Sequence, residues 1–282
     1  MPGLFDPEGI NQIAKRHSSL MRLGDVGRRY MAGIATFAFL VLCVGLVEAE
    51  VSLARMISGA ARLGDFAVLM MPPEPGPNLK LYVFAMIETL GIALLGTVIA
   101  SSLAFPFAVL ASRNVLPIWI VRFFLRRSFD TIRGVETLIW ALIWISAVGM
   151  GPFAGVLAMA TGDFATFGKM FAETIETADQ RPVEGIRSTG GTTAQEFRFG
   201  ILPQVLPIIA GQVLYYFESN TRSATIIGIV GAGGIGLHLS ELIRTLEWRQ
   251  VSFIVLIILV VVAAIDFLSS RLRQMIGGQK PI

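Results

Sequence analysis

The chain has 282 residues, of which 54% are hydrophobic and 15% are charged, whereas soluble domains carry roughly 25% charged residues. Its 23 Lys and Arg residues exceed its 20 Asp and Glu residues, which gives a net charge of +3. This composition excludes a disordered chain, a basic nucleic-acid-binding domain and an ordinary soluble enzyme, and it indicates an integral membrane protein.

Several apolar stretches are long enough for transmembrane helices, which need about 20 residues. In chain order they lie at residues 30–47, 81–111, 137–148 with the turn before it, 153–177, 203–230 and 251–269. The arginine-rich stretch 115–133 suits an interfacial amphipathic helix. Residues 1–29 are polar and basic without an early apolar core, so they do not suggest a signal peptide. We therefore expect an all-α polytopic membrane protein with about six transmembrane helices.

This pattern divides the chain into an N-terminal segment (1–29), a first transmembrane helix with a proline-containing outer loop (30–80), and the remaining spans (81–282). If both termini face the cytoplasm, sixteen of the 23 basic residues fall in inside segments, five fall outside and two lie within spans. That asymmetry agrees with the positive-inside rule. It also puts the polar loop 178–202 in the cytoplasm.

The loop between the fourth and fifth spans is predicted to form two short helices joined by a glycine turn. Pro182 and Glu184 suit the first turn of a helix, because proline is tolerated there and an acidic side chain interacts favourably with the helix dipole. Gly190 is expected to end this helix. Thr192 and Gln195 have the spacing of a capping box, which starts a second helix. The two short helices would lie on the membrane surface.

The same loop resembles the EAA loop of ABC-importer permeases, whose pattern is Glu-Ala-Ala, three residues, Gly, nine residues, Ile, one residue, Leu-Pro. The matches in register are Glu184, Gly190, Leu202 and Pro203. Gly185 and Ile186 replace the two alanines, and Gly200 replaces the isoleucine. In that family the loop forms the helix that docks in a groove of the ATPase subunit. The resemblance gives the ATPase-coupling role to Glu184, Gly185, Ile186, Gly190, Leu202 and Pro203. An ordinary amphipathic interhelical loop is the alternative.

Other segments narrow the resemblance to phosphonate-type permease subunits. They are residues 149–155, 182–190, 217–225, 228–236 and 266–273. The resemblance covers roughly residues 80–275 and implies the type I ABC importer permease fold over residues 81–282. That family imports phosphonates, and some members handle phosphate or phosphite.

The resemblance also implies a set of partners. These are a second copy of the chain, a dimer of cytoplasmic ABC ATPase subunits, an extracytoplasmic substrate-binding protein and the lipid bilayer of the bacterial inner membrane; no nucleic acid is expected. No Walker A sequence occurs, so ATP and Mg would be bound by the ATPase subunit and the chain itself would be a transport subunit, not an enzyme. With Cys43, His17 and His238 as its only cysteine and histidines, it offers no evident metal or cofactor site.

Charged residues inside spans are costly and are functional candidates by default. They are Glu88, Glu136, Asp163, Lys169, Glu218 and Arg222. A guanidinium matches the geometry of an oxyanion, so Arg222, with Asn220 and Ser223 beside it, is a candidate contact for a phosphonate in transit. Glu218 precedes Arg222 by four residues, and the alternative is a structural ion pair between them.

Lys169 is the second basic residue within the spans and a second candidate for the substrate pathway. It could instead snorkel, or pair with Glu173 one turn later. An ion-coupled secondary transporter of a small anion, using Glu88, Asp163 and Lys169, is the rival function, although the sequence shows no clear internal repeat. An intramembrane enzyme is a third possibility. The Gly-rich string 231–236 has the form GxGxxG but follows a membrane span, so close packing is expected there instead of dinucleotide binding.

Overall fold

The computed structural model describes residues 25–49, 52–116 and 118–276. Within these ranges the regular structure is helical, which confirms the all-α class, and the chain forms two compact units that divide between Val68 and Leu69. Most of the expected N-terminal segment, up to residue 24, lies outside the described ranges.

The first unit contains α3 (Asp25–Glu48) and α4 (Leu53–Leu69). Helix α3 includes the first expected span and is long and apolar enough to cross a membrane. Helix α4 was not expected, since it lies within the stretch predicted to be the outer loop before residue 80. A three- and four-residue spacing puts Ile57, Ala60 and Gly64 on one face of α4, whereas Arg62 lies on the opposite face, so this helix is amphipathic.

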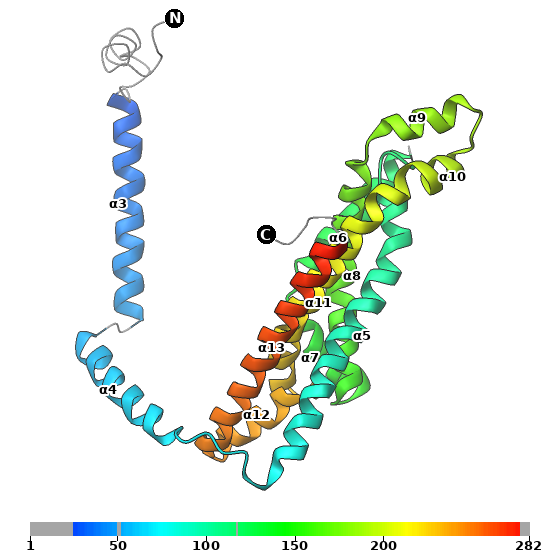
Figure 1. Cartoon of the computed structure of the whole chain (residues 1–282). Helices are drawn as coiled ribbons and strands as arrows, with labels where there is room; N and C mark the ends of the chain where they lie inside the picture. Colours follow the sequence, from blue (N-terminus) through cyan, green and yellow to red (C-terminus); the bar gives the residue numbers. More distant parts are fainter. Residues whose placement is uncertain (1–24, 50–51, 117, 277–282) are drawn as a thin grey trace, which may run out of the picture. The chain divides into compact units, whose positions relative to one another are not determined.

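The second unit is a helical bundle (Figure 1). Its helices are α5 (Leu79–Ala111), α6 (Trp119–Arg133), α7 (Thr137–Val148), α8 (Pro152–Glu176), α9 (Gln180–Ser188), α10 (Thr193–Gln195), α11 (Leu202–Ile229), α12 (Ile235–Arg244) and α13 (Trp248–Ile276). A π-helical segment, Glu196–Ile201, joins α10 to α11. The five later spans and the amphipathic stretch predicted from the sequence all correspond to helices; α12 was not expected.

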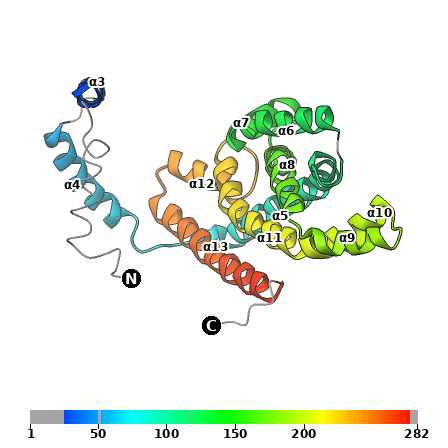
Figure 2. The ribbon, with the colours of Figure 1, turned by 90° about the horizontal axis from the view of Figure 1, so that it is seen from above.

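Helix α8 is the centre of this bundle and packs against α5, α6, α7 and α11 (Figure 2). Small residues allow the close approach of these helices. A Cβ atom at Gly96 of α5 would lie 2.7 Å from the Cβ of Met159 on α8, and a Cβ at Gly168 of α8 would lie 2.5 Å from the ring of Phe129 on α6. Alanines of α5 that face α8 are fully buried at positions 93, 100, 104 and 108.

Length and apolar composition identify four helices of the described chain as candidate membrane spans, and a fifth if α6 and α7, which meet at a bend of 86°, are taken together. The sequence predicted about six. The difference is α8, which has 25 residues but is too rich in small and polar residues to meet the same criterion. Because its surface is covered by protein, α8 does not need the lipid-compatible composition of an exposed span.

The Gly-rich string 231–236 connects α11 to α12 at the end of the bundle opposite α9 (Figure 1). Gly234 has φ +71° and its N–H donates to Glu88 at 2.8 Å. The next N–H, of Ile235, donates to the hydroxyl of Thr89 at 2.8 Å. Glu88 and Thr89 belong to α5. They accept from the N–H groups at the start of α12, which have no partners within their own helix. Glu88 therefore helps to cap a helix. A Cβ atom at Gly233 would lie 2.8 Å from the backbone nitrogen of Pro152, which confirms the close packing expected for this string.

Candidate functional site

The loop expected to be cytoplasmic and to couple to an ATPase folds as a hairpin of α9 and α10 that projects beyond the other helices of the bundle (Figure 1). Asp179 caps α9 by accepting a hydrogen bond from the N–H of Arg181 at 3.1 Å. Pro182 lies in the first turn, as the sequence predicted, but the expected place of Glu184 in that turn was wrong, because α9 already begins at Gln180 and Glu184 is its fifth residue. Gln204 of α11 fixes the root of the hairpin, since it accepts from the Asp179 N–H at 3.0 Å and donates to the Asp179 carbonyl at 3.1 Å.

The turn of the hairpin has the geometry expected from its sequence. Gly190 has φ +83°, a conformation that glycine adopts without strain. The N–H of Gly191 donates to the carbonyl of Ile186 at 3.0 Å, which closes the end of α9. Thr192 and Gln195 form the predicted capping box, and the Thr192 N–H donates to the Gln195 side chain at 2.8 Å. Three local motifs therefore define this hairpin.

The second arm of the hairpin does not end before Pro203, the residue at which the expected fifth span begins. Helix α10 instead runs through the π-helical segment into α11 without a break. Within that segment Gly200 is buried against α9: a Cβ there would lie 3.0 Å from Val183 Cγ2 and 3.4 Å from Ile186 Cδ1. This contact explains two departures from the EAA pattern together, because the large Ile186 occupies the space that a small residue at position 200 leaves.

An ion pair that was not expected from the sequence holds the two arms of the hairpin together. Arg187 donates to Glu196 through both Nε and Nη2, each at 2.9 Å. The Glu196 side chain is 11% exposed, whereas that of Arg187 is 67% exposed. Among the residues with a proposed coupling role, Glu184, Gly185, Gly190 and Pro203 are exposed, and Ile186 and Leu202 are half-buried. The hairpin thus presents a polar outer surface on a fixed frame.

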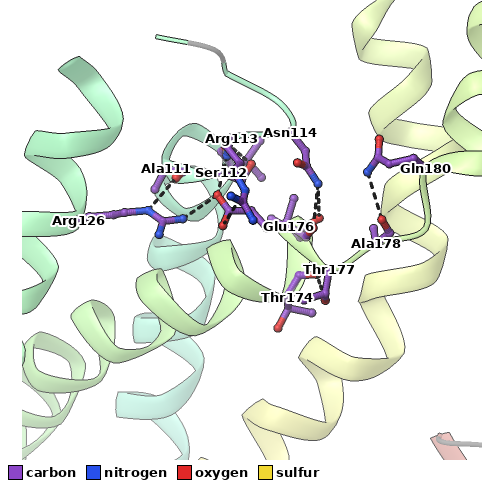
Figure 3. Close-up of polar contacts among 12 residues, drawn as sticks. Ala111, Ser112, Arg113, Asn114, Arg126, Thr174, Glu176, Thr177, Ala178 and Gln180 are labelled. Atoms are coloured by element: carbon purple, nitrogen blue, oxygen red, sulfur yellow. Dashed lines mark hydrogen bonds and ion pairs between the residues drawn. The ribbon is translucent and has the colours of Figure 1, made fainter. Parts of the chain in front are cut away.

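Glu176, at the end of α8, anchors the root of the hairpin to two other helices (Figure 3). One of its carboxylate oxygens accepts from Arg126 of α6 at 2.7 Å and from the N–H of Arg113, just after α5, also at 2.7 Å. Asn114 donates to the Glu176 carbonyl at 3.1 Å. Since α9 begins four residues after Glu176, this cluster links the hairpin mechanically to α5 and α6.

The candidate substrate residues on α11 lie on different faces. Arg222 is exposed, and its Nη2 lies 3.9 Å from Glu218 Oε1, at the long end of ion-pair distances. Arg273 of α13, which sequence reasoning did not single out, donates to the other oxygen of Glu218 at 3.0 Å. Ser223 is half-buried and its hydroxyl donates to the Ser219 carbonyl at 3.4 Å. The expected Glu218–Arg222 ion pair is therefore present, but it is longer and weaker than the ion pair between Glu218 and Arg273.

Asn220 does not share the face of Arg222. It is buried and donates to Thr97 of α5 at 2.8 Å and to the carboxylate of Asp163 on α8. These three side chains form a polar link among three helices in the interior of the bundle. Two residues along a helix turn by about 200°, which accounts for the separation of Asn220 from Arg222.

Lys169 also has a structural partner, but not the expected one. Its ammonium group donates to Asp130 of α6 at 2.7 Å, and this pair joins α6 to α8. Pairing with Glu173 was therefore the wrong alternative. Within the described part of the chain, no group of three or more His, Cys, Asp or Glu side chains has the arrangement of a metal site.

The fold and the hairpin agree with comparisons to known proteins. Residues 104–277 match the family described as the binding-protein-dependent transport system inner membrane component. HtxC of Stutzerimonas stutzeri, named for a phosphite transport system, is 39% identical over 258 residues, which cover 91% of each chain. The phosphate-import permease protein PhnE of Mycolicibacterium smegmatis is 34% identical over 271 residues, which cover 96% of this chain and 49% of that protein.

A solved structure supports the same fold at lower sequence identity. A chain of the MetNI methionine ABC transporter, in an inward-facing conformation, superimposes with a TM-score of 0.60 and 19% identity, covering 72% of this chain and 99% of that one. This likeness confirms the type I ABC importer permease fold expected from the sequence. Together with the family match over more than half of the residues, it leads to one assignment: the chain belongs to the family of binding-protein-dependent transport system inner membrane components.

Proposed function

We propose that this permease translocates a phosphorus oxyanion, such as phosphite, phosphate or a phosphonate, across the bacterial inner membrane, driven by separate ATPase subunits. The substrate class is inferred from two relatives, named for phosphite transport and phosphate import, that match nearly the whole chain. In this proposal both termini are cytoplasmic and a binding protein delivers the oxyanion to the outer face. ATP and Mg are bound by the ATPase subunits, and this chain holds no cofactor.

The proposal that this chain couples to an ATPase is supported by the rigid hairpin of α9 and α10. A segment that transmits motion must resist bending, and this one is held by the Arg187–Glu196 pair and by the contact of Gly200 with α9. Its outer surface, which includes Glu184, is free to dock in a groove of the ATPase. The Glu176 cluster at its root would carry the movement into α5 and α6.

A second copy of the chain would form the other wall of a substrate pathway beside α11. Residues seven apart share one face of a helix, and one such set on α11 is exposed: Ile208, Tyr215, Arg222 and Ile229. Because an arginine facing lipid is costly, this stripe suits a protein or water-lined neighbour better than lipid. Two copies packed about α11 would place two Arg222 guanidiniums along the pathway of a dianion.

The test is uptake in liposomes that contain the permease with its ATPase subunit and binding protein. We expect ATP-dependent accumulation of labelled phosphite, phosphate or methylphosphonate, and no uptake when the ATPase subunit is left out. Accumulation by the permease alone, driven by a proton or sodium gradient, would instead support the ion-coupled rival. All three residues proposed for that rival have structural partners: Glu88 at the start of α12, Lys169 in its pair with Asp130, and Asp163 in its contact with Asn220.

A further inference from the structure

Glu218 lies between two arginines, and the closer of them comes from another helix. Arg273 of α13 donates to Glu218 Oε2 at 3.0 Å, whereas Arg222 of α11 is 3.9 Å from Oε1 and makes no hydrogen bond to Glu218 among the described contacts. The Glu218 side chain is 10% exposed and that of Arg273 is 28% exposed, but that of Arg222 is 54% exposed. The carboxylate is therefore neutralised mainly on its α13 side.

Arg273 is held in this position by a second contact. Its guanidinium lies 5.8 Å from the centre of the Tyr215 ring, on the α11 turn that precedes Glu218. Such a cation–π contact attracts the guanidinium toward the face of the ring. Two guanidiniums thus accompany one carboxylate, and the positive charge in excess is on the exposed one, Arg222.

We infer that Arg273 is a positioning residue for transport: it neutralises Glu218 and so leaves the Arg222 guanidinium available to an oxyanion. This inference rests on the proposed function, in which Arg222 meets the substrate. An acidic residue four positions before an arginine is the favourable order for a helical ion pair. Where water is scarce that attraction strengthens, so without Arg273 the carboxylate would draw Arg222 onto itself and repel the incoming anion.

The experiment compares variants of the complete importer, reconstituted with its ATPase and binding protein and assayed for uptake of inorganic phosphite and phosphate. Arg273→Gln is expected to raise the KM for uptake about tenfold, equivalent to about 1.4 kcal/mol, with little change in the maximal rate. Adding Glu218→Gln removes the competing carboxylate and should return the KM to about twice the parent value or less. Arg271→Gln is the matched control, since Arg271 also lies on α13 but packs over Phe267.

The outcomes separate this inference from the proposed function. If Arg222→Gln transports normally, Arg222 is not the substrate contact, and both ideas about this site fail. If Arg222→Gln is inactive but Glu218→Gln does not rescue Arg273→Gln, Arg222 keeps its proposed role and the inference about Arg273 is wrong. Copurification with the ATPase and basal ATP hydrolysis show whether each variant assembles. Should Arg273→Gln not assemble, Glu218→Gln alone decides: parent KM supports the inference, and a tenfold rise overturns it.

Discussion

Arg187 and Glu196 form a two-pronged ion pair across the hairpin of α9 and α10, with both nitrogen–oxygen distances at 2.9 Å. A planar guanidinium facing a carboxylate in this way constrains angle as well as distance. The pair therefore defines how α9 is oriented relative to the helix that continues into the bundle. In the proposed coupling to an ATPase, a force applied to α9 would therefore be passed to α11 instead of being absorbed by the turn at Gly190.

The first prediction concerns this pair. Arg187→Gln should leave the protein folded and inserted but reduce the amount of substrate imported per ATP hydrolysed severalfold, because the hairpin can flex. The measurement is simultaneous uptake and ATP hydrolysis in reconstituted importer. Arg198→Gln is the control, since Arg198 contacts the exposed Phe199 and does not bridge the arms. An unchanged ratio in Arg187→Gln would mean that the ion pair does not contribute to coupling.

The second prediction concerns the two replacements in the EAA pattern. Gly200→Ile should disrupt the hairpin, because even a Cβ at this position lies 3.0 Å from Val183. Combining it with Ile186→Ala, which restores the family's pairing of a small residue with a large one, should recover ATPase binding and transport. Both are measured by copurification and uptake. If the double variant is no better than Gly200→Ile, the two positions do not compensate each other.

The third prediction concerns the Glu176 cluster. Glu176→Gln removes the charge that Arg126 contacts at 2.7 Å, so the unfolding free energy should fall by about 1.5–3 kcal/mol, as for other hydrogen bonds to charged groups. Thermal unfolding of the detergent-purified protein measures the change. The exposed Glu173, one turn earlier on α8, provides the control Glu173→Gln. Equal midpoints for both variants would contradict a structural role of this cluster.

The fourth prediction concerns the buried polar link among α5, α8 and α11. Asn220→Ala removes the hydrogen bonds to Thr97 and Asp163 and should destabilise the bundle by about 0.6–1.7 kcal/mol per interhelical bond. Ser223→Ala should change stability little, because Ser223 bonds only to its own helix among the described contacts. Chemical unfolding in mixed micelles distinguishes them. A substrate role for Asn220 would instead appear as a raised KM at unchanged stability.

The fifth prediction concerns topology. In a Cys43→Ser background, single cysteines introduced at positions 62 and 244 should react with a membrane-impermeant maleimide added from outside. A cysteine at position 187, on the hairpin proposed to be cytoplasmic, should react only after the membrane is opened. All three positions are exposed, so access to their side chains is limited by the membrane and not by burial. Labelling of position 187 from outside would overturn the orientation and the coupling proposal with it.

Features that depend on local sequence could be predicted before the structure. The apolar runs gave the spans, and the Thr192–Gln195 spacing gave the cap of α10. Pairs between distant segments could not be predicted in this way: Glu218 with Arg273 and Glu176 with Arg126 join residues that only the bundle brings together. The sequence shows that such charges must find partners, but the choice among many arginines depends on helix packing.

Two features that were predicted wrongly, the face of Asn220 and the structure of residues 53–69, could have been predicted correctly from helical spacing. Asn220 was grouped with Arg222 because the residues are neighbours along the chain, yet a separation of two puts them on opposite sides of a helix. Helix α4 was assigned to a loop because its apolar residues are interrupted by Arg55, Arg62 and Asp65, although their three- and four-residue spacing is that of an amphipathic helix.

The π-helical segment before α11 has a geometric consequence for any change in its length. A π-helical turn contains more residues than the 3.6 of an α-helical turn, so side chains before and after it are out of phase with a single regular helix. Removing one residue from 196–201 would let the segment become α-helical while turning α10 and its partner α9 little about the axis of α11, because the wide turn absorbs one residue more than an α-helical turn. A one-residue deletion in the regular part of α11 would instead shift everything before it by about 100°, so 196–201 is the place where this helix tolerates a change of length.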